Sequence, residues 1–217
     1  MSLKSFILNI LFPIECLGCQ SEGSWLCEKC FRRLKFNDRK YTLQTPNLKE
    51  IFIAGDYDDK ILADLIKKFK FNFIDNIALI LGRYLSLFWQ GIIFSQPELK
   101  ATENILLIPL PLSKKREHWR GFNQAELIAK SFNAANSYQI NLNLKKIKDT
   151  KTQSSLGELG RGKNIKDCFF WVGDNLTGQT IILIDDIVTT GATMNEAAKI
   201  LKEAGAGNIY GLVIAKG

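Results

Sequence analysis

The stretch "IILIDDIVTTGAT", residues 181–193, joins an apolar run to a short polar loop within a chain of 217 residues. Four aliphatic residues precede two carboxylates, Asp185 and Asp186, and hydroxyl-bearing residues and Gly191 follow them. Because side chains alternate in direction along a strand, at least one carboxylate should enter a crevice where a strand over 180–184 ends. In open α/β sheets, ligands bind at this carboxyl end of the strands. The stretch therefore predicts a ligand site.

A phosphate group would suit the residues that follow the doublet. A helix N-terminus offers backbone N–H groups, Thr189, Thr190 and Thr193 offer hydroxyls, and a glycine permits close approach of the backbone. Carboxylates accept hydrogen bonds and suit vicinal sugar hydroxyls. Together these groups predict a ribose 5-phosphate site, with the carboxylates on the 2- and 3-hydroxyls. The alternative is a strand end followed by an ordinary helix cap, in which Thr and Gly are common.

Composition limits the class of protein. A hydrophobic content of 46% allows one substantial core and a small satellite unit. A net charge of +7 favours polyanionic or phosphorylated ligands, although many ordinary basic domains share it. The run 76–94 contains polar interruptions and predicts a buried helix rather than a membrane span. Residues 1–12 predict an amphipathic helix ended by Pro13, not a signal peptide, so we expect a cytoplasmic protein.

Four of the five cysteines form two CxxC pairs, Cys16 with Cys19 and Cys27 with Cys30. Two such pairs can surround one zinc ion tetrahedrally, and four sulfur ligands leave no open position, so this zinc would be structural. The alternatives are two disulfides or a redox pair. Cys168 stands apart and predicts a small buried hydrophobic residue.

The order of elements predicts an α/β fold with a mainly parallel sheet flanked by helices. A polar segment over 37–50 indicates a boundary near residue 45, with an N-terminal helix and zinc-binding unit over 1–45 and a larger domain over 46–217. A short helix should begin within "CEKCFRRLKF". In the larger domain we expect helices over 58–72, 72–94, 122–135 and 192–204. Strands are expected over 50–57, 104–112, 140–147, 168–172, 179–188 and 208–215.

The pattern of aliphatics, DD, two aliphatics, TTG and a further Thr resembles the phosphoribosyl-pyrophosphate (PRPP) motif of type I phosphoribosyltransferases. With the four-cysteine unit, "IPLPLSKKREHWRGFNQAELIAKSF" and "TQSSLGELGRGKNIKDCFFW", nearly the whole chain resembles the ComF family (ComF/GntX). The resemblance implies a phosphoribosyltransferase fold, a zinc-finger-like unit and a part in DNA uptake during natural transformation. It also implies that magnesium-PRPP is held by Asp185, Asp186, Val188, Thr189, Thr190, Gly191, Ala192 and Thr193.

Two basic segments complete the expected site. The loop after the strand at 104–112 should face pyrophosphate through Lys114, Arg116 and Arg120, because positive charge neutralises a leaving anion. The segment 148–166 is either a disordered insertion or a lid that excludes water from the reacting sugar. Residues of this segment that match the family pattern are Gln153, Arg161 and Asn164. Lys145 and Lys146 stand where many relatives carry an Arg, which leaves a point charge instead of a bidentate contact.

Two functions remain open. The first is a transferase that moves ribose 5-phosphate from PRPP to an unidentified nitrogenous acceptor, with Asp185, Asp186 and Arg120 in catalytic positions. The second is an accessory module that contacts single-stranded DNA and a helicase-like competence protein and keeps the pocket as a ligand site. Trp119 and Trp171 could stack on bases, although tryptophans more often lie in the core.

Overall fold

The computed structural model describes residues 13–38, 43, 45–71, 74, 76–102, 104–147 and 168–217. The helices are α2 (Glu28–Phe31), α3 (Lys60–Phe71), α4 (Ile77–Ser95), α5 (Pro97–Lys100), α6 (Lys114–Arg120), α7 (Gln124–Asn133) and α9 (Ala192–Glu203). The strands are β1 (Glu50–Asp56), β2 (Ile105–Pro109), β3 (Gln139–Ile140), β4 (Leu144–Lys146), β5 (Phe169–Trp171), β6 (Thr180–Val188) and β7 (Ile209–Lys216). The helix predicted over 1–12 lies outside the described residues.

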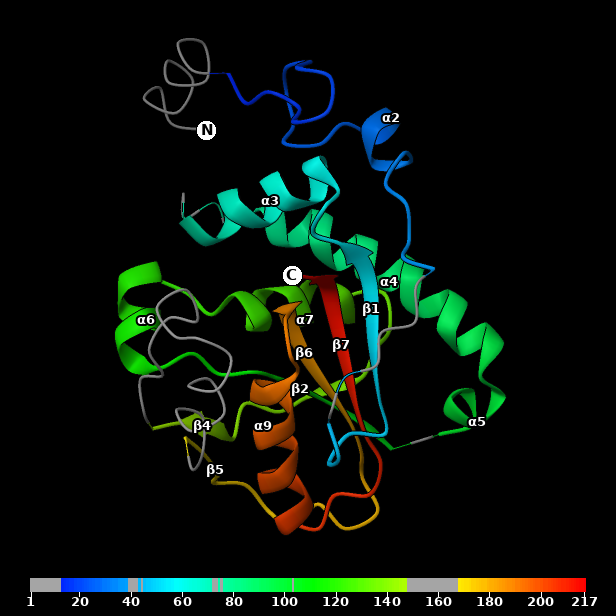
Figure 1. The fold of residues 1–217 in the computed structure, drawn as a ribbon, viewed down its shortest axis with the longest axis vertical. Coiled ribbons are helices and arrows are strands. Elements are labelled where there is room, and N and C mark those ends of the chain that lie inside the picture. Colours follow the sequence, from blue (N-terminus) through cyan, green and yellow to red (C-terminus); the bar gives the residue numbers. More distant parts are fainter. Residues whose placement is uncertain are drawn as a thin grey trace.

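Five strands form a sheet in the order β1-β7-β6-β2-β3, and every neighbouring pair is parallel (Figure 1). The parallel α/β sheet predicted from the sequence is therefore confirmed. The single strand expected over 140–147 was wrong, because the segment divides between β3 of this sheet and β4, which pairs with β5. The chain turns between them where the side chain of Asn141 accepts a hydrogen bond from the backbone nitrogen of Asn143 at 2.8 Å.

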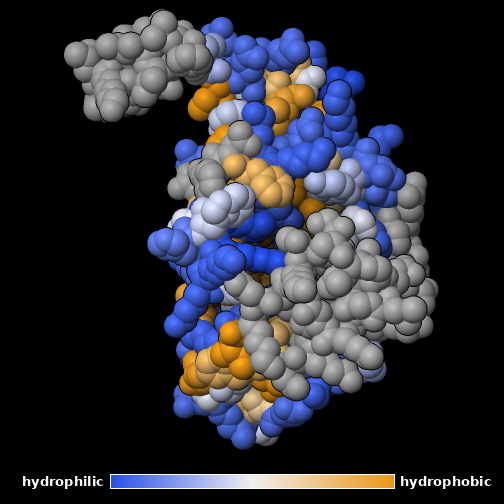
Figure 2. All heavy atoms as spheres, turned by 60° about the vertical axis from the view of Figure 1, so that its left-hand side comes forward, coloured by the Kyte–Doolittle hydropathy of each residue, from blue (hydrophilic) through white to orange (hydrophobic). Residues whose placement is uncertain are grey.

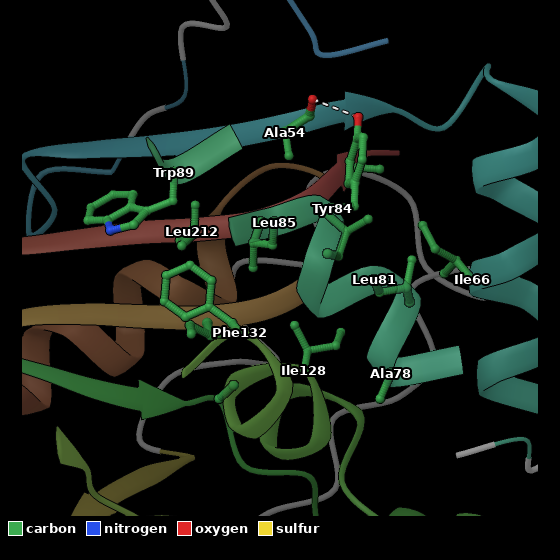
Figure 3. Packing of buried hydrophobic residues seen from close by; sticks show 14 of the residues in the cluster. Ala54, Ile66, Ala78, Leu81, Tyr84, Leu85, Trp89, Ile128, Phe132 and Leu212 are labelled. Carbon is green, nitrogen blue, oxygen red and sulfur yellow. Dashed lines mark hydrogen bonds between the residues drawn. The ribbon is translucent and has the colours of Figure 1, made fainter. Parts of the chain in front are cut away.

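Two layers of helices cover the sheet. Ile182 and Ile184 of β6 point to the face covered by α3, α4 and α7, whereas Ile181 and Leu183 point to the face covered by α9. Figure 3 shows the first of these cores, in which Trp89 of α4 and Phe132 of α7 pack against the sheet. Their rings meet edge to face at 6.3 Å. Burial on both faces explains why the central strands are apolar along their length.

The helix predicted over 72–94 begins later, at Ile77, and packs into the core as expected. Tyr84 and Trp89 are fully buried, and the hydroxyl of Tyr84 donates to the backbone oxygen of Ala54 at 3.0 Å. Within the described part of the chain, α4 is the one helix whose length and composition would allow it to cross a membrane. Its buried face is accounted for by the contacts with β1, β7 and α7.

Strand β6 ends at Val188, in agreement with the strand expected over 179–188, and passes residue 184, where the apolar run alone predicts an end. Asp185 pairs with Val213 and Ile187 with Ala215 in β7, so the acidic doublet lies inside the strand rather than after it. Because the strands are parallel, the carboxyl end of β6 shares one edge of the sheet with the ends of β1, β2 and β7. The residues that follow β1 and β2, which lead into α3 and α6, start from this same edge.

Candidate functional site

The acidic doublet lies at the carboxyl edge of the sheet. Strand geometry directs Asp185 and Asp186 to opposite faces. Asp186 is only 6% exposed, and its Oδ1 lies 3.0 Å from Nζ of Lys70, near the end of α3. Asp185 is partly exposed, and its Oδ1 accepts a hydrogen bond from the backbone nitrogen of Asp186 at 2.8 Å. The doublet therefore presents one paired carboxylate and one available to a ligand.

The pKa of Asp185 lies well above the ordinary value of a carboxyl group. Burial, followed by the neighbouring charge of Asp186, raises the pKa of Asp185 to about 7, although Lys70 and Lys146 act in the opposite direction. A carboxyl group whose pKa is strongly shifted by desolvation and a neighbouring charge is a candidate functional group. The local environment thus gives Asp185 a property that a plain strand end would not have.

Arg120 is the member of the predicted basic group whose charge interacts with both carboxylates of the doublet. Burial lowers the pKa of its guanidinium, and the charge of Asp186 opposes this effect. Its Nη1 donates to Oε1 of Gln124, the last residue of "RGFNQ", at 2.7 Å. Nε of Arg120 and Nε2 of Gln124 are buried and have no hydrogen-bond partner among the described residues. Buried donors without partners are rare in proteins, which favours a ligand acceptor at this point.

The segment expected to form the pyrophosphate loop with Lys114, Arg116 and Arg120 is instead helix α6, so the expectation of a loop was wrong. The side chain of Ser113 caps α6 by accepting from the backbone nitrogen of Arg116, and Gly121 ends the helix with φ +74°. Both are ordinary helix signals that the charge run obscured. Lys114 and His118 are exposed. Trp119 is 58% exposed, so the core position considered for it is wrong.

The loop after the doublet leads directly into α9. Val188 is buried, Thr190 is exposed, and Gly191 is the N-cap residue with φ +79°. Glycine is an ordinary cap residue and has no side-chain acceptor, so the first backbone N–H groups of α9 receive none from Gly191 itself. The hydroxyl of Thr190 lies 3.4 Å from the backbone nitrogen of Ala192. The start of a twelve-residue helix is thus arranged as a cradle that an anion could occupy.

Residues before β1 cover this loop, although the sequence predicts a plain linker there. A Cβ added at Gly191 would lie 2.6 Å from Cγ2 of Thr45, so only glycine fits. The backbone nitrogen of Asn47 donates to Oδ1 of Asn195 in α9 at 3.0 Å. The segment therefore forms one wall of the candidate site.

A cleft of 840 Å³ lies between the end of β2, the starts of α6 and α7, and the β4–β5 pair. Its charged lining residues are Lys114, Lys115, Glu117, Glu126, Lys145 and Lys146, and apolar side chains of the β4–β5 pair complete the lining. Figure 2 shows this face, where hydrophobic side chains gather below a hydrophilic band. The other predicted residues of this region, Gln153, Arg161 and Asn164, lie outside the described residues. Trp171 is partly buried and donates from Nε1 to the backbone oxygen of Asp174 at 2.8 Å.

A second candidate site is the cysteine unit. The sulfur atoms of Cys16, Cys19, Cys27 and Cys30 all lie within 4.8 Å of one another, and no disulfide joins the described cysteines. Zinc–sulfur bonds of about 2.3 Å place the sulfurs of a tetrahedral site about 3.8 Å apart, so this cluster fits a metal ion. A Cβ at Gly18 would lie 2.7 Å from the sulfur of Cys30, which explains the glycine in the first CxxC turn.

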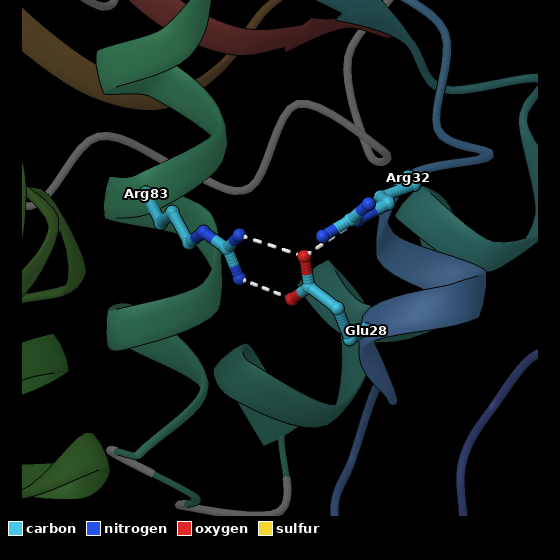
Figure 4. A network of polar contacts seen from close by, with 3 residues as sticks. All are labelled: Glu28, Arg32 and Arg83. Atoms are coloured by element: carbon cyan, nitrogen blue, oxygen red, sulfur yellow. Dashed lines mark hydrogen bonds and ion pairs between the residues drawn. The ribbon is translucent and has the colours of Figure 1, made fainter.

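The cysteine unit packs onto the body of the protein. Glu28 of α2 accepts hydrogen bonds from Arg83 of α4 at 2.7 and 3.0 Å and from Arg32 at 2.9 Å (Figure 4). Hydrogen bonds from Arg83 and then Arg32 hold the pKa of Glu28 at about 2. Cys16 and Phe31 belong to the same apolar core as α3 and α4. The boundary near residue 45 stays a prediction. Cys168 is fully buried, as predicted.

The structure thus brings Asp185, Asp186, Arg120 and the loop up to Thr193 to one edge of the sheet. It adds Lys70, which no sequence motif assigns to the site. The one indication in the sequence is that Lys70 lies in the last turn of a helix that begins at the same edge of the sheet, next to the buried Phe69. That signal is weak, because a lysine near a helix C-terminus is ordinary.

Comparison with known proteins agrees with this picture. Residues 121–216 match the model of the phosphoribosyl transferase domain. Competence protein F of Haemophilus influenzae is 33% identical over 197 residues, which cover 89% of this chain and 80% of that protein. Competence protein ComFC of Bacillus subtilis is 42% identical over 106 residues, which cover 48% of this chain and 40% of that protein. DNA utilization protein YhgH of Escherichia coli (strain K12) is 30% identical over 165 residues, which cover 74% of this chain and 69% of that protein. The identity with these relatives and the match to the phosphoribosyl transferase domain show that this chain belongs to the ComF family, within the type I phosphoribosyltransferase superfamily.

Proposed function

We propose that this chain binds magnesium-PRPP at the carboxyl end of β6. Asp185 and Asp186 hold the ribose hydroxyls, and the loop from Val188 to Thr193 holds the 5-phosphate. The observation that carries the proposal is the order of groups along one short segment. A carboxyl group with a pKa of about 7 is followed, after a short loop with Thr189 and Thr190, by the glycine-capped N-terminus of α9.

The residues of the site fit the charge that a departing pyrophosphate would develop. Arg120 lies within electrostatic reach of Asp186 and has an unpartnered buried Nε, so its guanidinium can bind an anion beside the ribose. Magnesium bound with PRPP supplies further neutralisation of the phosphate oxygens. Carboxylates on the ribose hydroxyls fix the ring, which leaves its first carbon facing the basic side of the site.

We further propose that the four cysteines hold one structural zinc ion and that the protein acts in the cytoplasm in DNA uptake during natural transformation. Support for the biological role comes from the names of the relatives, competence proteins and a DNA utilization protein. The cysteine cluster supports the metal, since four converging sulfurs are the donor set of structural zinc sites.

Two modes of action agree with the pocket. In the first, the ribose is transferred to a nitrogenous base. In the second, the bound ligand only regulates an accessory module that contacts single-stranded DNA and a helicase-like partner. The exposed Trp119 and the lysines that line the 840 Å³ cleft support binding of single-stranded DNA in the second mode. Bases stack on aromatic rings, and phosphates bind cations.

Calorimetry tests the ligand. Wild-type protein should bind PRPP in the presence of Mg²⁺, and Asp185→Asn/Asp186→Asn should lose at least tenfold in affinity, because neutral amides are weaker acceptors for hydroxyls. Asp58→Asn/Asp174→Asn is the matched control, since it removes the same charge from two exposed positions. Equal affinity of the wild type and the first double variant would exclude the proposed site.

A screen of candidate bases with PRPP, scored by pyrophosphate release, separates the two modes of action. Release with one base and loss of release in the double variant would establish transfer. Tight binding of PRPP without release, together with a DNA affinity that falls steeply with salt, would establish the accessory role.

A further inference from the structure

Lys70 forms an ion pair unlike the others in the described part of the chain. Its side chain is 18% exposed, and that of its partner Asp186 is 8% exposed. In the other ion pairs found among the described residues, the side chain of the cation is at least 45% exposed. Removing two charges from water is costly and seldom improves stability over an apolar pair. The position of Lys70 therefore calls for a role besides stability.

The residues on either side of Lys70 fix it beside the basic part of the site. The ring of Phe69 stacks on Phe122, the residue before the cap of α7, with the ring centres 5.4 Å apart. The guanidinium of Arg120 lies 6.0 Å from the centre of the Phe71 ring. Both contacts tie the end of α3 to the junction of α6 and α7. Lys70 and Arg120 thus approach Asp186 from neighbouring elements.

A ligand that occupies Asp186 changes the balance of charge around Lys70. If this carboxylate accepts a ribose hydroxyl, its attraction for the ammonium group is shared with the ligand, and a second anion can compete for the lysine. In a ribose 5-phosphate carrying a 1-diphosphate, that second anion is the diphosphate, and Arg120, whose Nε is buried and unpartnered, interacts electrostatically with the same carboxylate. The flexible four-carbon stem of lysine allows such a change of partner.

We infer that Lys70 binds the diphosphate of the incoming ligand and pairs with Asp186 only while the site is empty. This inference rests on the proposed function, because it needs a sugar phosphate at the doublet. It assigns Lys70 to one part of the ligand and predicts no contact with the 5-phosphate, which belongs to the start of α9.

Three ligands distinguish that assignment by calorimetry: PRPP, magnesium diphosphate and ribose 5-phosphate, which lacks the diphosphate. Lys70→Met should weaken binding of the first two at least tenfold, as expected for loss of a hydrogen bond to a charged group. The affinity of Lys70→Met for ribose 5-phosphate should stay within about threefold of the wild type or increase, because Asp186 no longer has to leave an ion pair to accept a ribose hydroxyl. Lys70→Arg keeps the charge and should recover most of the diphosphate affinity.

Lys67→Met is the matched control, since it removes a positive charge from an exposed position on the same helix. Thermal unfolding of each variant shows whether it folds, and Lys70→Gln replaces Lys70→Met if the latter does not. If Lys70→Met loses affinity equally for all three ligands, or loses none for magnesium diphosphate, the inference is overturned. Binding of PRPP by the wild type would still support the proposed function in that case. A wild type that binds none of the three ligands overturns both.

Discussion

Two groups of Asn47 donate to the side-chain oxygen of Asn195, the backbone nitrogen at 3.0 Å and Nδ2 at 3.2 Å. Asn195 lies in the first turns of α9, and its own backbone nitrogen donates to the oxygen of Gly191. The bonds therefore join residues 148 positions apart in the chain. They fasten the segment before β1 to the loop that we propose binds the 5-phosphate.

Asn195→Ala should loosen this connection. The change leaves two donors of Asn47 without their acceptor in a partly buried place, at a cost on the order of 1–2 kcal/mol. For a chain of this size, each kcal/mol lowers Tm by about 2–4 °C. Ribose 5-phosphate should also bind several-fold more weakly. Lys199→Ala, at an exposed position of α9, should change neither quantity, and an unaltered Tm in Asn195→Ala would show that the segment is not held by these bonds.

Gly191→Ala should damage both stability and ligand binding. The residue has φ +79°, and the new Cβ would approach Cγ2 of Thr45 to 2.6 Å, so strain of about 1–3 kcal/mol is expected. Gly91→Ala is the control, because Gly91 lies inside α4 and a Cβ added there would have no atom within 4 Å. That change should stabilise the protein by about 0.5–1 kcal/mol. Urea unfolding of both variants measures the difference, and equal effects would contradict the geometry of the loop.

The sequence predicts much of this fold because its central strands are apolar on both faces and its helices carry clear stripes. Leu62, Leu65, Ile66 and Phe69 of α3 are all buried, as their spacing predicts. The errors lie where local patterns compete. Residues 140–147 alternate like one strand, yet they divide between β3 and β4. The apolar run alone predicts a strand end at 184, whereas the longer stretch 179–188 predicts the extent of β6, which pairs with β7 as far as Val188.

The candidate site is less predictable than the fold, because its walls come from distant segments. Polarity identifies residues 37–50 as a linker but does not reveal that Thr45 and Asn47 contact α9. Lys70 has no motif of its own, and only the packing of α3 brings it within 3.0 Å of Asp186. Residues that act through long-range contacts leave no signal in local spacing.

The pKa of Asp185 predicts how stability depends on pH. Its carboxyl titrates at about 7 in the folded protein, against an ordinary value of 3.8. Between these values the folded state binds more protons than the unfolded state, so the free energy of unfolding should fall as pH rises from about 4 to about 7. Above pH 7 this contribution should stay constant.

Asp185→Asn does not titrate and should remove this dependence. The variant should exceed the wild type in stability at pH 8, by a few kcal/mol at most since each pKa unit corresponds to about 1.4 kcal/mol, and the difference should shrink at pH 5. Urea unfolding at the two pH values gives the comparison. Asp174→Asn, at an exposed position, serves as control. A variant less stable than the wild type at pH 8 would mean that the carboxylate is favourably paired.

Zinc should be bound in a ratio of one ion per chain by the cysteine unit, and its removal should destabilise the protein. The unit contributes Leu26 and Phe31 to the core shared with α3 and α4, so disorder around the metal would expose apolar surface there. Metal analysis should find zinc lost in Cys27→Ser and retained in Cys168→Ser, because Cys168 is remote from the four ligands and fully buried. A thiol count under denaturing conditions after chelation should give five. A count of one in a metal-free protein of unchanged Tm would instead establish two disulfides and exclude the zinc site.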